Sequence, residues 1–172
     1  MEKFENKGIE FPSDLTDDDK QLIIRQCELQ KATTKEEIEG FAQAYKQAKD
    51  LALDEKKLES MSDEDVLDLI FELAEKTDKV NEKGVRTVPV RFGNMNQALP
   101  PDQIERALTV FSKFYAAGEF EPVEAYTEFE KIHPFVDGNG RVGDLLWKIA
   151  VTRELGEWPE ELPPDVFGSN NQ

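Results

Sequence analysis

Apolar residues recur every three or four positions along most of the chain, which is the spacing of amphipathic helices. In the first half, this pattern predicts helices from Ser13 or Thr16 to about residue 31, from 33 to 52 and from 62 to 76. Serine or threonine followed by acidic residues is typical of the start of a helix. The charged stretch 54–59 is predicted to link the second and third of these helices.

The helical period is interrupted at residues 84–95, where the segment VRTVPV is rich in β-branched residues. Such residues favour extended structure, but Pro89 excludes a central strand, so an edge strand or small hairpin is predicted. Further helices are predicted from 99 to 117, from 121 to 133 and from 142 to 156. The middle one of these is expected to bury one face, made of Val123, Tyr126, Phe129 and His133.

Together these elements predict an all-α fold of about six or seven helices around one core, with one small β-hairpin. A chain of 172 residues is long enough for one domain with a sizeable core. Within a single domain 1–172, residues 1–32 are predicted to be an N-terminal helical extension, 33–160 the core and 161–172 an irregular tail.

Composition and charge narrow the classes of function. The formal net charge is −16, which disfavours binding to a phosphate backbone, so no direct nucleic-acid contact is expected. No apolar run approaches the roughly 18 residues of a membrane span, and the first residues carry no secretory pattern. The single cysteine, Cys27, allows no internal disulfide and indicates a reducing, cytoplasmic compartment. Its helical spacing predicts a core residue and no nucleophile.

The candidate chemistry lies in residues 132–147, IHPFVDGNGRVGDLLW, which begin with the only histidine of the chain. Two glycines at 138 and 140 let backbone approach an anion, and the N-terminus of the next helix favours negative charge there. Arg141 can donate in a fork to phosphate oxygens, and Asp137 is a suitable ligand for Mg²⁺. His133 changes its charge near neutral pH and is the natural general base. Each residue alone has an ordinary structural explanation, but their combination at this spacing does not.

The segment from His133 to Arg141, HPFVDGNGR, resembles the signature of the Fic family, HPFx(D/E)GNGR, at every fixed position. The resemblance implies transfer of AMP from Mg²⁺-bound ATP to a Ser, Thr or Tyr hydroxyl of a target protein. It implies these roles: general base for His133, loop anchor for Phe135, metal ligand for Asp137, α-phosphate contact for Asn139, anion cradle for the backbone of Gly138 and Gly140, and outer-phosphate contact for Arg141.

The sequence departs from the family at Asp144, where many AMP-transferring members carry a second arginine. A carboxylate near the outer phosphates would repel a nucleotide unless a metal lies between them. The departure leaves open a changed nucleotide pose, another transferred group or a weakened enzyme. Doc-type kinases and phosphocholine transferases also lack this arginine, although the glycine form of the motif is nearer to the AMP-transferring branch.

Residues 38–40, Ile-Glu-Gly, resemble the inhibitory helix of self-inhibited Fic proteins, (S/T)xxxE(G/N), with Glu39 as the inhibitory residue. Lys35 stands where serine or threonine is expected, and the usual arginine partner is replaced by Asp144. Inhibition by Glu39 is therefore expected to be absent or rebuilt. The alternative is an ordinary surface glutamate beside a packing glycine.

Residues 84–95 resemble the Fic flap, which docks an extended segment of the target. Arg86, Thr87 and Val88 are candidate docking residues, and the target would lie along 85–91; a purely structural hairpin is the alternative. A separate antitoxin or inhibitory partner is also left open. A Doc-like kinase, or a weakened Fic scaffold that acts as an acidic protein-binding module, are the alternatives to AMP transfer.

Overall fold

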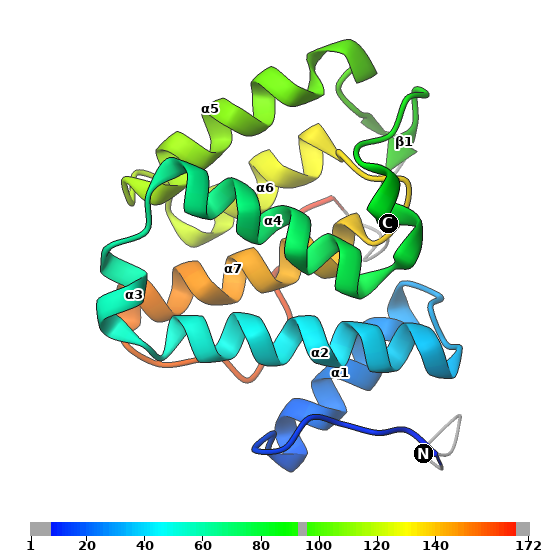
Figure 1. Ribbon diagram of the computed structural model, residues 1–172, viewed down its shortest axis with the longest axis vertical. Coiled ribbons are helices and arrows are strands. Elements are labelled where there is room, and N and C mark those ends of the chain that lie inside the picture. The colour runs from blue at the N-terminus through cyan, green and yellow to red at the C-terminus, as the bar shows by residue number, and fades with distance from the viewer. Residues whose placement is uncertain (1–7, 93–95, 168–172) are drawn as a thin grey trace.

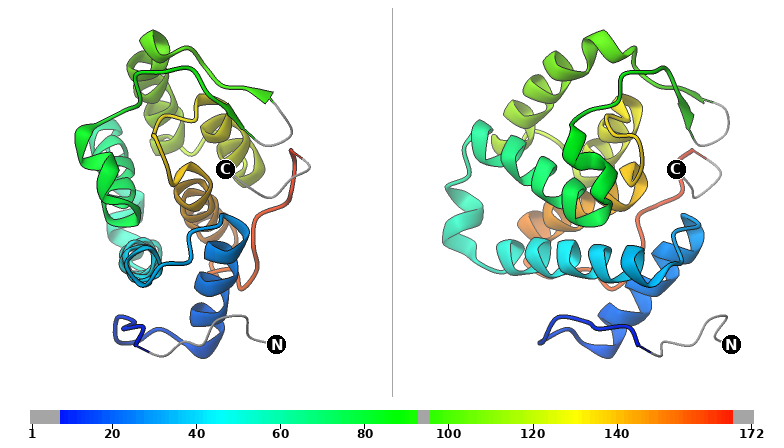
Figure 2. Two further views of the ribbon diagram at one scale, coloured as in Figure 1. Left: turned by 90° about the vertical axis from the view of Figure 1, so that its right-hand side faces the viewer. Right: turned by 45° about the vertical axis from the view of Figure 1, so that its right-hand side comes forward.

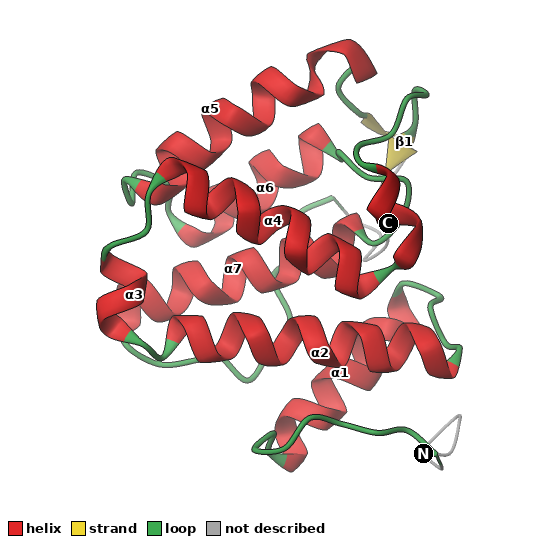
Figure 3. Cartoon of the chain, in the orientation of Figure 1, coloured by secondary structure: helices red, strands yellow, loops and turns green. Residues whose placement is uncertain are grey.

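A computed structural model describes residues 8–92 and 96–167 of the chain. Within that part, seven α-helices account for most of the structure, joined by two short 3-10 helices and one two-stranded antiparallel hairpin (Figures 1 and 3). The prediction of an all-α fold with one small hairpin is confirmed. The α-helices are α1 (Asp17–Leu29), α2 (Lys35–Ala52), α3 (Glu55–Glu59), α4 (Asp63–Thr77), α5 (Ile104–Ala116), α6 (Pro122–Ile132) and α7 (Asn139–Leu155).

Local capping chemistry determines where the helices begin. Thr16, Thr34 and Ser62 cap α1, α2 and α4, and each forms a capping box with the acidic residue three positions later. These starts agree with the predicted ones. The predicted link at 54–59 is corrected, because Asp54 accepts a hydrogen bond from the Lys57 amide and begins the short helix α3.

Helix α7 lies at the centre of the bundle and is buried along nearly its whole length. Helices α2, α4 and α6 pack around it, and α5 lies across α4 and α6 (Figure 1). Trp147 was expected at the edge of the buried side of this helix, but it is buried because other helices surround α7. The expected face of α6 is corrected in part: Phe129 and His133 are buried as predicted, but Val123 is 42% exposed in the first turn, and Ala125 and Ile132 face the core.

Helix α1 is fastened to this bundle by buried polar contacts. Asp19 accepts hydrogen bonds from the Tyr45 hydroxyl at 2.7 Å and from Lys49 Nζ at 2.6 Å, both on α2. Burial opposes ionisation of Asp19, but its hydrogen bonds outweigh that effect and hold its pKa below the usual value. Gln26, two turns further on, donates to Asp144 of α7 at 2.8 Å. The C-terminal half of α1 therefore lies against the first turns of α7 (Figure 2).

The hairpin is smaller than predicted. Strand β1 (Arg91–Phe92) pairs with β2 (Asn96–Gln97), and the intervening residues lie outside the described ranges. Residues 85–90 form no strand; instead the Arg86 amide donates to the carbonyl of Pro134 in the loop before α7. This contact places the predicted flap directly beside the end of α6.

Gly40 sets the separation of α2 and α4. A Cβ at this position would overlap the backbone oxygen of Lys76, in the last turn of α4. The two helices can approach this closely only because residue 40 has no side chain. Gly40 is about one turn after Glu37 on α2, and Lys76 is two residues before Asp78. Their contact therefore also determines how near Glu37 and Asp78 lie.

Gly40→Ala is expected to lower the free energy of unfolding by about 1–3 kcal/mol, because the added methyl group meets rigid backbone. Urea unfolding of the variant, compared with Glu36→Ala at an exposed position of the same helix, measures the effect. Equal stability of the two variants would show that α2 and α4 separate at no cost.

Candidate active site

The end of α6 turns sharply at His133, whose backbone is left-handed with φ of 48°. Two residues later, the Phe135 side chain is fully buried and makes an edge-to-face contact with Phe71 of α4, with ring centroids 5.4 Å apart. The anchoring role expected of Phe135 agrees with this contact. The turn and the anchor hold His133 and the start of α7 on the same side of the bundle.

Asn139 closes the loop. Its Oδ1 accepts from the Phe135 amide at 2.9 Å, and its Nδ2 donates to the Phe135 carbonyl at 2.8 Å. Both polar ends of the side chain are therefore used within the loop, and the residue is buried. In this arrangement the Asn139 side chain gives the loop its shape, and its contact with an α-phosphate stays a prediction.

Arg141 and Asp137 lie side by side at the N-terminus of α7, with 3.4 Å between Nη2 and Oδ1. Arg141 is only 1% exposed, and its Nε and Nη1 have no hydrogen-bond partner among the described residues. Leaving buried, charged N–H groups unpaired is costly. The helix N-terminus beside them also attracts negative charge, so an anion would satisfy both.

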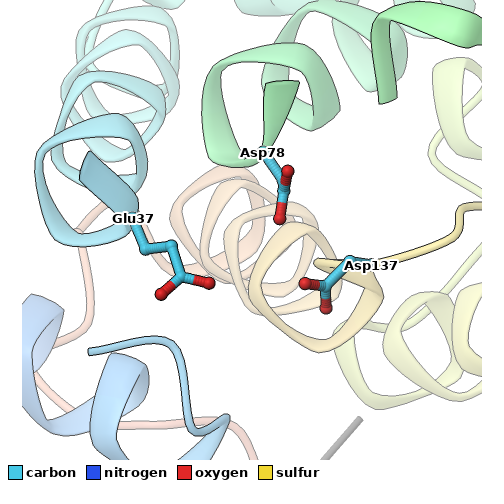
Figure 4. A group of neighbouring side chains, drawn as sticks. All are labelled: Glu37, Asp78 and Asp137. Carbon is cyan, nitrogen blue, oxygen red and sulfur yellow. The ribbon is translucent and has the colours of Figure 1, made fainter. Parts of the chain in front are cut away.

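Three carboxylates converge beside the loop. Asp137, Glu37 of α2 and Asp78 at the end of α4 each offer an oxygen within 4.8 Å of the others, and Figure 4 shows the side chains pointing toward one another. Partial burial raises the pKa of Asp137, and its hydrogen-bond contact with Asp78 raises it further, against the opposing effect of Arg141. Hard oxygen donors that repel one another are suited to Mg²⁺. Only Asp137 was predictable from the sequence, because the other two carboxylates come from distant segments.

Asp144 does not face the loop, which corrects the expectation that its charge would meet the outer phosphates. The side chain is 1% exposed and forms an ion pair with Lys148, one turn later on α7, besides accepting from Gln26 of α1. Lys148 is itself fully buried. The pairing at positions i and i+4 was readable in the sequence and would have indicated this arrangement.

The Gln30 side chain covers the backbone of Gly140. A Cβ at position 140 would lie 2.7 Å from Gln30 Oε1 and 2.9 Å from its Cδ, so the glycine makes room for the amide. Gln26, one turn earlier on α1, donates to Asp144, one turn later on α7. The end of α1 therefore packs against the first turn of α7, where part of the anion cradle is expected.

Glu39 lies away from the loop. It pairs with Lys35 at 3.0 Å and accepts a hydrogen bond from the Glu10 amide at 2.7 Å. Together with the packing of Gly40 against α4, this favours the alternative that residues 38–40 are a surface glutamate beside a packing glycine. An inhibitory contact of Glu39 with Asp144 is not formed in this structure.

Arg86 is buried and does not face a target, which corrects its assignment as a docking side chain. Its guanidinium donates to four backbone carbonyls, those of Val88, Leu99, Ile132 and His133. These contacts cap the end of α6. They also join it to Val88 within the flap and to Leu99, four residues after the flap. Thr87 and Val88 are exposed, so a docked chain could reach them.

Phe92 of the flap stacks on the His133 ring, with centroids 5.0 Å apart and an angle of 22° between the planes. Phe167 in turn contacts Phe92 edge-on at 5.0 Å. The histidine is left 5% exposed. This stack could not be predicted from the sequence, because the three residues are separated by long stretches of chain.

Cys27 is fully buried on α1, as predicted. Burial raises the pKa of its thiol to about 12, so it stays protonated near neutral pH. It is therefore not a nucleophile of this site.

The fold and the loop define an all-α domain that presents a histidine, a glycine-rich turn and a buried arginine at the start of its central helix. The chain belongs to the Fic/Doc family, whose sequence model matches residues 60–149, more than half of the 172 residues. No curated protein matches the chain. Membership suggests a transferase with protein or antitoxin partners. Across residues 8–92 and 96–167, no helix has both the length and the apolar character to cross a membrane.

Arg86→Lys is expected to lower the free energy of unfolding by about 3 kcal/mol, because an ammonium group cannot reach all four carbonyls and leaves buried acceptors unpaired. Chemical unfolding checks this, with Arg106→Lys on the exposed side of α5 as the matched control. A similarly small change in both variants would contradict the capping role.

Proposed function

We propose that the protein transfers AMP from Mg²⁺-bound ATP to a Ser, Thr or Tyr hydroxyl of a target protein. The observation that carries this proposal is the buried Arg141, two of whose nitrogens have no hydrogen-bond partner among the described residues. It lies beside Asp137 at the N-terminus of α7, one short turn from His133. The arrangement combines an anion site, a cation site and a base. Family membership supports a transferase in general terms.

The phosphates of the nucleotide would bind over Gly138, Gly140 and Arg141. The first backbone N–H groups of a helix have no partner within it, and they are directed toward a ligand at its N-terminus. Arg141 would donate through Nε and Nη1. Gln30 would have to turn away from Gly140 for the phosphates to reach the backbone there.

Mg²⁺ would be held by Asp137, with Glu37 and Asp78 as further oxygen ligands. The donor chemistry fits, since burial and, to a smaller extent, Asp78 raise the pKa of Asp137, and a divalent cation would favour its charged form against both effects. When bound, the ion would supply positive charge for the phosphate oxygens.

In the transfer step, the target hydroxyl oxygen forms a bond to the α-phosphorus, and the bond from that phosphorus to the leaving pyrophosphate breaks. The hydroxyl proton passes to His133, which acts as the general base. Nδ1 of this histidine faces Glu130, with Oε1 at 3.3 Å and the backbone oxygen at 3.2 Å, so Nε2 is the nitrogen that takes the proton.

The internal pairing of Asp144 with Lys148 supports nucleotide binding, because it removes the electrostatic objection raised by the missing arginine. It does not select which phosphoryl group is transferred. A Doc-like kinase would use the same residues with the nucleotide reversed. The target chain would lie along residues 85–91, where Thr87 and Val88 are exposed.

We expect incubation with Mg²⁺, α-labelled ATP and a cell lysate to label a target protein, while γ-labelled ATP gives no label. His133→Ala should abolish labelling and keep nucleotide binding, because the base lies outside the phosphate site. Label from γ-labelled ATP alone would assign the protein to the kinase reaction. If neither label appears and calorimetry shows no ATP binding, a protein-binding scaffold replaces both, once other nucleotide donors have been tested.

Asp78→Asn is expected to weaken Mg²⁺ binding, measured by titration calorimetry without nucleotide, about tenfold. Binding to the unmodified chain should also weaken as pH falls, because the raised pKa of Asp137 lets protons compete with the metal at a higher pH than at an ordinary carboxylate. Asp68→Asn, exposed on α4, is the control. Unchanged affinity in Asp78→Asn would remove this residue from the site.

A further inference from the structure

Glu130 is a buried carboxylic acid with no part in the chemistry described so far. It lies on α6 three residues before His133 and is 3% exposed. Its Oε1 is 3.3 Å from Nδ1 of His133, and its backbone oxygen is 3.2 Å from the same nitrogen. Apart from this contact, Oε1 has no hydrogen-bond partner among the described residues. Burying a carboxylate in this way is costly unless a positive charge lies beside it.

The surroundings leave the imidazole as the natural partner. On α7, a Cβ at Gly143 would lie 3.2 Å from Oε2, so the missing side chain there makes room for the carboxylate. Tyr126 lies beside the same point and has a pKa raised by burial. Burial also raises the pKa of Glu130, and His133 opposes that effect through a hydrogen bond and its charge.

Other charged groups near the pair are already occupied. Arg86 of the flap is directed at backbone carbonyls, including that of His133. Asp144 of α7 is paired with Lys148. The charge of Asp165 raises the pKa of Tyr126, which lies beside Glu130. Among the described residues, His133 is the group whose charge lowers the pKa of Glu130. Glu130 and His133 therefore form one electrostatic unit.

We infer that Glu130 is a positioning residue for His133, whose carboxylate orients the imidazole through Nδ1–H and stabilises the positive charge that the ring gains at Nε2. The inference deepens the proposed function, since it concerns the base of that reaction. The proton leaves the target hydroxyl and binds Nε2, while the proton on Nδ1 stays on that nitrogen. Glu130 itself takes no proton, in keeping with the role of the acidic residue in a catalytic triad.

The single histidine makes a direct test feasible, because the imidazole signals of the full chain belong to one residue. A two-bond ¹H–¹⁵N spectrum at a pH where the ring is neutral should show the proton on Nδ1. A proton on Nε2 would overturn the inference, and this measurement requires no variant.

Glu130→Gln removes the charge and nearly preserves the shape. The midpoint of the His133 titration, followed by the same signals, should move to lower pH by about one unit, because the imidazolium loses its counter-charge. Glu128→Gln, exposed on the same helix, should move it by less than roughly 0.2 unit, since surface charges are screened. Equal midpoints for Glu130→Gln and the unmodified chain would overturn the inference; if this variant fails to fold, the comparison is repeated with Glu130→Met, which also removes the charge, and an unchanged midpoint there would overturn the inference in the same way.

These readouts are independent of transfer activity, so the inference and the proposed function can fail separately. If transfer is observed, Glu130→Gln should lower kcat and move the acidic limb of the kcat profile to lower pH, with KM for ATP unchanged. A rise in KM with an unchanged pH profile would indicate a structural role alone and would contradict positioning.

Discussion

The helix at the centre of the bundle must satisfy every polar group that it carries, because water does not reach it. Helix α7 is buried from Asn139 to Thr152 with a single intermediate position, yet it contains an arginine, an aspartate and a lysine. Asp144 and Lys148 neutralise each other, and Gln26 completes their hydrogen bonding from α1. Replacing one partner of such a pair is far more costly than its net contribution suggests, since the other charge stays buried.

Arg141 differs from the other buried charged residues of α7 in its incomplete hydrogen bonding, and it lies directly beside the loop. Its neighbours are satisfied internally, while two of its nitrogens have no partner in the described part of the chain. A buried arginine with incomplete hydrogen bonding is stabilised when a ligand supplies the missing acceptors. Arg141 lies where the helix N-terminus and the glycines already favour an anion. The structural and functional parts of α7 thus differ in whether their charges are paired inside the protein.

Local signals made much of the fold readable from the sequence, and tertiary contacts account for what was missed. The caps Thr16, Thr34 and Ser62 act over three residues, so helix starts were predictable. The meeting of Glu37 and Asp78 depends on the close approach at Gly40, which no periodicity encodes. Arg86 was expected to dock a target because it lies in a segment that resembles the Fic flap, whereas four carbonyls from separate parts of the chain hold it inside. The domain boundaries at residues 32 and 160 stay a prediction.

The packing of the end of α1 against Gly140 has a thermodynamic consequence. A ligand that binds Gly140 on the side where a Cβ would lie must first displace the Gln30 amide, and the free energy of that displacement is subtracted from the ligand's own contacts. Its apparent affinity therefore depends on how firmly Asp19 and Gln26 hold α1, although neither contacts Gly140. Strengthening the attachment of α1 would make the fold more stable and the loop harder to occupy, so these two properties oppose each other.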